Sequence, residues 1–176
     1  YFSLFLLALR VVVPRISKGK DSNQQAGTPQ WIFDVVNGVI PCGIDLAADS
    51  SNSKCVLFYN EHDNSLVQPW HKVTTKALAG WCNHPYENCG IWIRKARDEV
   101  RLGATAIQFQ PAALHRNYYT DYVKGEACAR VIINHPIQFD GYSWSSPILH
   151  ALFIWNQGLL GSGLDRVHEV NLKDPA

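Results

Sequence analysis

The segment "IWIRKARDEVRLGATAIQFQ" (residues 91–110) decides the fold class. Apolar residues recur in it at three- and four-residue spacings, at Ile91, Trp92, Ala96 and Leu102, with charged residues between them, which predicts an amphipathic helix over 91–102. Gly103 stands where a glycine that ends a helix belongs. Small or polar and apolar side chains alternate over 104–110, as in a strand. A helix that leads through a glycine into a strand is half of a βαβ unit.

The neighbouring segments extend this alternation in both directions. Residues 54–60 and 127–134 are short apolar runs that predict strands, and residues 112–125 predict a second helix that ends at Gly125. The runs 31–40 and 148–156 fit either a helix or a strand. Residues 1–16 predict a buried strand, because Arg10 interrupts a run too short to span a bilayer.

These elements predict an α/β fold over residues 1–176, as a single domain with a predominantly parallel sheet flanked by helices. The alternative is an α+β fold or a β-rich pocket fold. A chain of 176 residues is long enough to bury a core without a metal or a disulfide.

The overall charge is close to neutral, with 16 Lys and Arg residues against 15 Asp and Glu residues. We therefore expect no nucleic acid and no membrane as a partner, because the net charge gives no sign of the broad basic surface that would attract either of them. The composition, 47% hydrophobic and 18% charged, is that of a globular protein. It favours a soluble protein, with a slight lean towards the cytoplasm. The cofactor and the oligomeric state are unknown at this stage.

Polar residues follow each predicted strand. Because sites in α/β sheets form at the carboxyl ends of the strands, we expect these side chains to converge on a small-molecule substrate. Strands also end in polar residues simply because loops lie in water. The residues predicted to bind substrate are Gln110, Asn134, Asn156 and Gln157.

The richest of these clusters is "NEHDNS" (60–65). A carboxylate beside a histidine can fix the imidazole tautomer and raise its basicity, as acid–base catalysis needs. We therefore expect His62 and His135 to carry protons, with Glu61 or Asp63 orienting one of them. Neighbouring positions of the two histidines would strengthen this assignment, and a hydrated loop is the competing interpretation. No metal site is predicted.

The stretch "GWCNHPYENCG" (80–90) holds two cysteines around a histidine. Cys82 and Cys89 are too far apart in sequence for the usual zinc spacing, and a disulfide between them is sterically possible. The preferred interpretation is an ordinary loop that leads into the helix at 91.

The run "WIRKARDEVRLGATAIQFQPAA" with "RVIINHP" resembles the helix–strand–helix–strand core of type II dehydroquinases. Their "NGPNLN" signature is absent, and Gln110 stands where the family has an asparagine. The resemblance therefore implies α/β architecture alone, and we assign no family.

The function expected from these residues is a small-molecule enzyme, a hydrolase or a lyase, that uses histidine and carboxylate acid–base chemistry. The alternative is a non-catalytic small-ligand binding protein with an aromatic-lined pocket, since six tryptophans and seven tyrosines are available to line one.

Overall fold

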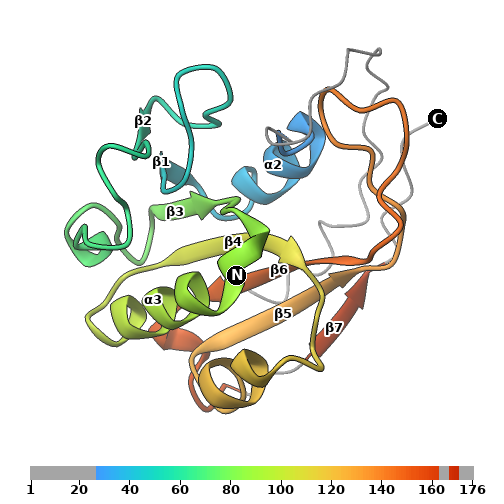
Figure 1. The fold of residues 1–176 in the computed structure, drawn as a ribbon. Coiled ribbons are helices and arrows are strands. Elements are labelled where there is room, and N and C mark those ends of the chain that lie inside the picture. Colours follow the sequence, from blue (N-terminus) through green and yellow to red (C-terminus); the bar gives the residue numbers. More distant parts are fainter. Residues whose placement is uncertain (1–26, 163–166, 171–176) are drawn as a thin grey trace.

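A computed structural model describes residues 27–162 and 167–170. Its core is a seven-stranded sheet with the order β2-β1-β3-β4-β6-β5-β7 (Figure 1). The strands are β1 (Cys42–Asp45), β2 (Leu57–Phe58), β3 (Ala79–Cys82), β4 (Ala106–Pro111), β5 (Cys128–Ile133), β6 (His150–Trp155) and β7 (Val167–Val170). The helices are α2 (Gln30–Asn37) and α3 (Cys89–Arg101), with short turns η1 (Trp70–Lys72), η2 (Tyr86–Asn88), η3 (Tyr119–Val123) and η4 (Gln157–Leu159).

The sheet is mixed, with most of its strands running in the same direction. Strands β2, β1, β3 and β4 are mutually parallel, and β7 is parallel to β5. Strand β6 lies between β4 and β5 and is antiparallel to both of them. The α/β class and the mostly parallel sheet are thus confirmed, with β6 as the departure from the prediction.

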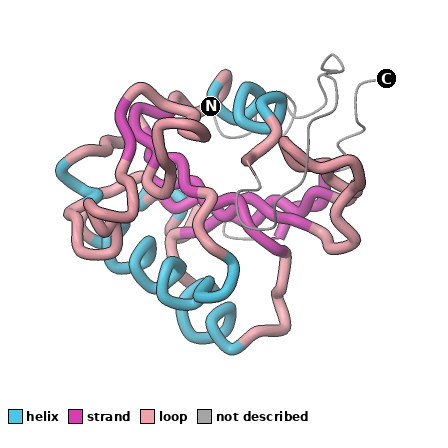
Figure 2. Tube along the Cα trace, turned by 45° about the horizontal axis from the view of Figure 1, so that its top comes forward, coloured by secondary structure: helices cyan, strands magenta, loops and turns pink. Residues whose placement is uncertain are grey.

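The two helices cover opposite faces of the sheet, as Figure 2 shows. Ile32, Phe33 and Val36 of α2 pack on the face that carries Trp81 and Phe109. Because both faces are covered, the central strands are buried along almost their whole length.

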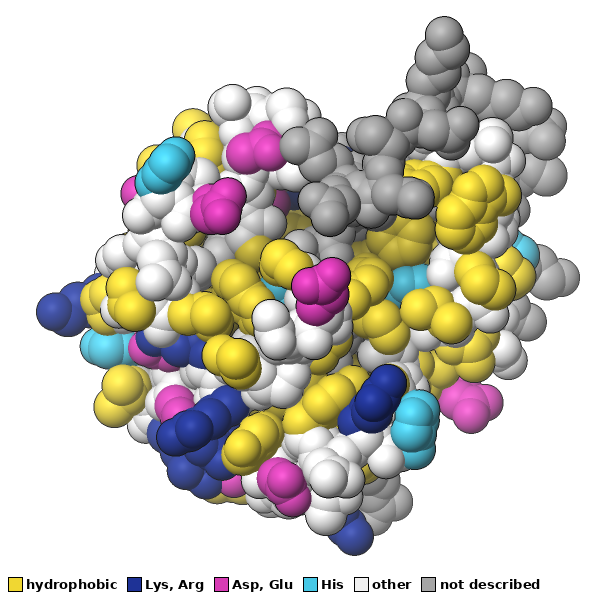
Figure 3. All heavy atoms as spheres, in the orientation of Figure 1, with side chains coloured by type: hydrophobic (Ala, Val, Ile, Leu, Met, Phe, Trp, Pro, Cys, Tyr) yellow, Lys and Arg dark blue, Asp and Glu magenta, His cyan; other side chains and the backbone are white. Residues whose placement is uncertain are grey.

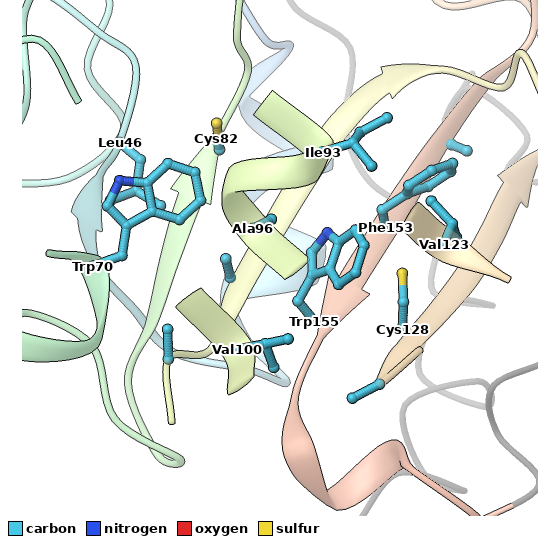
Figure 4. Close-up of a cluster of buried hydrophobic side chains, with 14 of the residues drawn as sticks. Leu46, Trp70, Cys82, Ile93, Ala96, Val100, Val123, Cys128, Phe153 and Trp155 are labelled. Atoms are coloured by element: carbon cyan, nitrogen blue, oxygen red, sulfur yellow. The ribbon is translucent and has the colours of Figure 1, made fainter. Parts of the chain in front are cut away.

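Helix α3 packs on the other face, and its apolar stripe explains why (Figure 4). Ile93, Ala96 and Val100 recur at three- and four-residue spacing and lie buried with Phe153 and Trp155 of β6. The helix ends at Arg101, and Gly103, just after the C-cap Leu102, has a φ of +102°, a left-handed conformation that favours glycine. The predicted helix–glycine–strand unit is confirmed.

Other predicted elements had mixed outcomes. The ambiguous run 31–40 is mainly the helix α2, and the run 148–156 contains the strand β6. The helix predicted over 112–125 is confirmed only in part: residues 112–116 are loop and turn, and the helical part is residues 117–123, of which Tyr119–Val123 is a π-helical turn. The strand predicted over 1–16 lies outside the described residues. None of the described helices is long and apolar enough to cross a membrane.

Glu99 ties α3 to the turn η1. Its buried carboxylate accepts a hydrogen bond from Lys95 Nζ at 2.6 Å and from the His71 backbone N–H at 3.0 Å, and it lies 2.6 Å from His71 Nδ1. Burial alone would raise the pKa of Glu99, but the hydrogen bonds from Lys95 and His71 outweigh it and lower this pKa.

The lowered pKa of Glu99 predicts a pH-dependent contribution to stability. A depressed carboxyl pKa stabilises the fold above the unfolded value of about 4.3, and this stabilisation is lost as pH falls through the folded-state pKa. At pH 7 we expect Glu99→Gln to lower the free energy of unfolding by about 1–3 kcal/mol. In urea unfolding, this difference should shrink as the pH falls below 4. Asp98→Asn, on the exposed side of the same helix, should cost less than about 1 kcal/mol. A Glu99→Gln deficit that stays constant with pH would contradict the assignment.

Candidate active site at the carboxyl edge of the sheet

The candidate site lies next to the point in the sheet where the strand order reverses. Strand β2, which follows β1 in the chain, lies on one side of β1. The next strand, β3, lies on the other side of β1, and all later strands lie beyond β3. Because β1, β3 and β4 are parallel, their carboxyl ends meet at one edge. The amino end of the antiparallel β6 lies at the same edge. Ligands of open α/β sheets bind in the crevice that such a reversal opens.

The turn Asn83–Tyr86 follows β3 at this edge and leads into α3. Asn83 is half-buried, and its Oδ1 accepts a hydrogen bond from the Tyr86 hydroxyl at 3.3 Å. Burial raises the pKa of Tyr86, so the hydroxyl stays protonated and able to donate. The turn therefore presents a side-chain amide next to an aromatic ring at the start of a helix.

The structure settles what the two cysteines beside this turn do. Cys82 is the last residue of β3 and Cys89 the first residue of α3, and both are buried free thiols. No disulfide joins them. The described residues contain no group of three or more side chains suited to holding a metal ion. The loop interpretation of 80–90 missed both β3 and the position of the turn at the site.

A cavity of about 580 Å³ opens beside the turn. Its size falls within the range of small-molecule and cofactor pockets, about 300–1,000 Å³. In Figure 3, apolar side chains gather in the middle of the visible face, with basic side chains below them. The cavity is bordered by the turn, the start of α3, the loop after β4 and the entry to β6, with the lining residues Tyr86, Glu87, Cys89, Gly90, Pro111, Ala112, Ala113, His115, Arg116, Tyr118, Ile148 and Leu149.

The buried side chain of His84 holds the Asn83–Tyr86 turn in place. Its imidazole is buried, stacks on Trp92 of α3 at 5.4 Å between ring centroids, and has Nε2 2.9 Å from Gln110 Oε1. Its Nδ1 lies 3.1 Å from the carbonyl oxygen of Pro85. Burial lowers the pKa of His84, which keeps the ring neutral near pH 7. His84 therefore joins the turn to α3 and β4 as a structural element.

His150 supports Tyr86 from the first position of β6. It is fully buried, its ring centroid lies 6.0 Å from that of Tyr86, and it also contacts Phe109 and Phe139. Burial lowers the pKa of His150 to about 4, so this ring too is neutral at pH 7.

Arg116 places a positive charge on the cavity wall. The other arginines in the described part of the chain bond to a carboxylate or a carbonyl oxygen, whereas Arg116 has no such partner there. Burial raises the pKa of the neighbouring Tyr118 to about 12, and the Arg116 charge opposes that shift. Arg116 and the adjacent His115 are exposed. They can meet an anion that approaches the cavity.

Asp45 ends β1 on the other side of the strand-order reversal. Its carboxylate is buried and accepts backbone N–H groups from Ala47 at 3.2 Å and Lys54 at 3.0 Å. Burial raises the pKa of Asp45. The Lys54 ammonium bonds to Gln30 and Asp140 instead, so no Lys or Arg side chain of the described residues forms an ion pair with this carboxylate.

The structure does not bring the predicted proton carriers together. Glu61, His62 and Asp63 lie in an exposed turn after β2, and Asp63 accepts the Asn60 N–H. His135 follows β5, and four strands lie between β2 and β5, which corresponds to a separation of about 24 Å. The catalytic role of these residues stays a prediction, but His62 and His135 do not form a pair.

The predicted substrate-binding residues lie at two different edges. Gln110 is buried at the site edge beside His84, and Asn134 is exposed after β5. Asn156 and Gln157 follow the antiparallel β6 and so lie at the opposite edge. There Asn156 bonds to Thr105 and to the Gly158 N–H, which holds the turn η4. The substrate-binding role of all four remains a prediction, and the convergence expected at one edge does not include Asn156 and Gln157.

The comparisons with known proteins gave one match. A family model described as DNA N-6-adenine-methyltransferase (Dam) matches residues 17–146, which is more than half of the chain. No curated protein and no solved structure shows a significant match. The matched region includes the Asn83–Tyr86 turn, Asp45 and Arg116.

The family match corrects four expectations. It overturns the hydrolase or lyase, and equally the non-catalytic ligand binder, in favour of a DNA-modifying methyltransferase. It also overturns the small-molecule substrate and the exclusion of nucleic acid, since members of this family act on DNA. The near-neutral net charge was a poor guide to nucleic-acid binding, because it sums the charges of the whole chain and does not describe the charge of one cavity wall.

Proposed function

We propose, from the premise that this chain belongs to the DNA N-6-adenine-methyltransferase (Dam) family, that it transfers a methyl group to the N6 amine of adenine in DNA at the Asn83–Tyr86 turn. The observation that supports this assignment is the position of the turn: Tyr86 lines a cavity of about 580 Å³ and its hydroxyl donates to the Asn83 amide oxygen, beside the strand-order reversal.

The target base must leave the duplex to reach such a site. The N6 amine is stacked and paired inside DNA, so an enzyme that modifies it extrudes the nucleotide into a pocket. Flipped bases are held by hydrogen bonds to their Watson–Crick edge and by stacking against aromatic or apolar side chains. The face of Tyr86, on the cavity wall, is suited to the stacking role.

Asn83 is suited to hold the reacting amine. The N6 lone pair of adenine is delocalised into the ring and is therefore a weak nucleophile. A carbonyl oxygen that accepts an N6–H draws the lone pair back onto nitrogen and aims it away from the ring plane. In this proposal the Asn83 Oδ1, which the Tyr86 hydroxyl orients, is that acceptor. N6 would then form its bond to the methyl carbon as that carbon's bond to the donor sulfur breaks, with the electron pair of the broken bond staying on sulfur, and N6 would release one proton to solvent.

The methyl donor expected for this reaction is S-adenosylmethionine, which supplies a methyl group activated on a positively charged sulfur. In this proposal the Asp45 carboxylate at the end of β1 would face that positive charge, because it forms no ion pair with a described Lys or Arg side chain. Asp45 and the backbone that follows it would hold the donor next to Asn83, since β1 and β3 are neighbours in the sheet.

The function is tested by incubating the protein with tritium-labelled S-adenosylmethionine and duplex DNA. We expect label in a mixed-sequence duplex and none in a duplex of guanine and cytosine alone, because the latter has no adenine to accept it. Equal labelling of both duplexes, or of neither, would refute the proposal.

Arg116 should contribute to DNA affinity through a phosphate. A side chain that neutralises one phosphate releases its counterion, so the slope of log affinity against log salt changes by about one unit when it is removed. We expect Arg116→Ala to weaken binding of unrelated duplexes to a similar extent and to reduce this slope by about one. Lys76→Ala, an exposed residue in the loop that precedes β3 at the opposite edge, is the matched control and should leave the slope unchanged. An unchanged slope for Arg116→Ala would exclude the phosphate contact.

A further inference from the structure

Two consecutive apolar side chains stand exposed on the rim of the cavity. Ile148 is 48% exposed and Leu149 is 47% exposed, and both line the cavity. They come directly before β6, at the same edge as the Asn83–Tyr86 turn. Exposed apolar residues at the mouth of a DNA-binding site need an explanation, because the side chains around such a site are expected to contact water or phosphate groups.

This rim is held by the sheet. The Leu149 carbonyl oxygen accepts the Ala112 N–H at 2.9 Å, which extends the pairing of β6 with β4 beyond the end of β4. The next residue, His150, is fully buried beneath Tyr86. Leu149 is thus connected on both sides to rigid elements, and the side chains at 148 and 149 keep their position relative to the turn.

The wall formed by the loop after β4 is basic, whereas the rim at the entry to β6 is apolar. Arg116 and His115 belong to that loop, and Ile148 and Leu149 belong to the entry to β6. The acidic Glu87 also lines the cavity, at the start of α3. A duplex seated over the mouth would then have its phosphates against the basic wall and its base stack against the apolar rim.

We propose that Ile148 and Leu149 form a wedge that enters the base stack and occupies the space left by the extruded adenine. This rests on the proposed function, because it requires a base that leaves the duplex. Proteins that kink or open DNA insert Leu, Ile and similar side chains between base steps, which offsets part of the cost of unstacking. The wedge acts on the duplex and does not touch the reacting atoms.

The test compares two substrates that differ only in base pairing. The first is a duplex with an adenine that the wild-type protein methylates, and the second has an abasic position opposite that adenine, which removes its pairing. The double variant Ile148→Ser, Leu149→Ser should lose about tenfold in kcat/KM on the paired duplex, which corresponds to 1.4 kcal/mol of the unpairing cost. On the unpaired substrate it should stay within about threefold of the wild type, since that cost is already removed.

Two matched variants separate a wedge from a damaged fold. Ile148→Leu keeps an apolar side chain and should retain activity on both substrates. Leu102→Ser replaces an apolar residue with 63% exposure at the far end of α3, at the opposite edge, and should have no effect on either. Equal losses on paired and unpaired substrates, or no loss on either, would overturn the wedge while leaving the methyltransferase intact. Absence of transfer by the wild type itself would overturn both proposals.

Discussion

Replacing Asn83 by alanine is expected to reduce methyl transfer about a hundredfold or more while leaving DNA binding within about threefold of the wild type. Removing one preorganised hydrogen-bonding group that acts at the reacting centre typically costs this much in kcat. The loss should appear in kcat more than in KM, because the Asn83 oxygen acts on the N6 amine after the base has entered the cavity. Single-turnover rates and duplex affinity measure the two effects separately.

The matched control for this variant is Asn88→Ala. Asn88 lies five residues further on, is exposed, and makes no side-chain cap to α3. It should therefore keep activity within about twofold, in line with surface substitutions elsewhere. If Asn83→Ala transferred methyl groups at the wild-type rate, or if it lost activity only because duplex affinity collapsed, the role assigned to its side-chain oxygen would be wrong.

Truncation of Trp155 to alanine should give the largest loss of stability, about 3–5 kcal/mol in the free energy of unfolding. Trp155 is fully buried on the α3 face of β6, among Ile93, Val100 and Phe153 (Figure 4). Its Nε1 donates to Gln108 Oε1 at 2.8 Å, and Gln108 Nε2 donates in turn to the Trp92 carbonyl oxygen. Alanine would leave both a cavity and an unsatisfied amide oxygen. Urea unfolding at pH 7 measures the loss.

Two variants separate the causes of that loss. Trp155→Phe keeps most of the buried ring but removes the N–H, so it should cost about 1–3 kcal/mol, the usual penalty for an unpaired buried acceptor. Trp144→Ala removes a tryptophan that is 54% exposed and should change stability by about 0.5 kcal/mol or less. If Trp155→Ala cost no more than Trp144→Ala, the packing described between α3 and β6 would be contradicted.

The fold was predictable wherever the local pattern and the burial agree. The apolar stripe of α3, the glycine that ends it and the alternation of β4 each specify one element, and the structure has all three. The prediction held only in part over 112–125. The first residues of this segment form a loop on the cavity wall, and its helical part, residues 117–123, is mainly a π-helical turn. There the tertiary environment overrides the local preference.

The site was harder to predict because it does not depend on titratable groups. Histidines and carboxylates pointed to His62 and His135, whereas the turn beside the cavity offers the Asn83 amide and the Tyr86 phenol ring. Strand β3 has four residues, two of them Ala79 and Gly80, and gives too short a pattern to be recognised. The available signal was the pair Asn83 and Tyr86 directly before an amphipathic helix, which acquires meaning once β3 is known to end at Cys82.

The most direct test of the account is to identify the methylated nucleoside. Duplex DNA is treated with S-adenosylmethionine carrying a deuterated methyl group, once with the wild type and once with Asn83→Ala, then digested and analysed by mass spectrometry. We predict deuterated N6-methyladenine in the wild-type digest and at most about one hundredth as much with the variant. Label on cytosine, or equal N6-methyladenine from both proteins, would contradict the assignment of this turn as the site of adenine methylation.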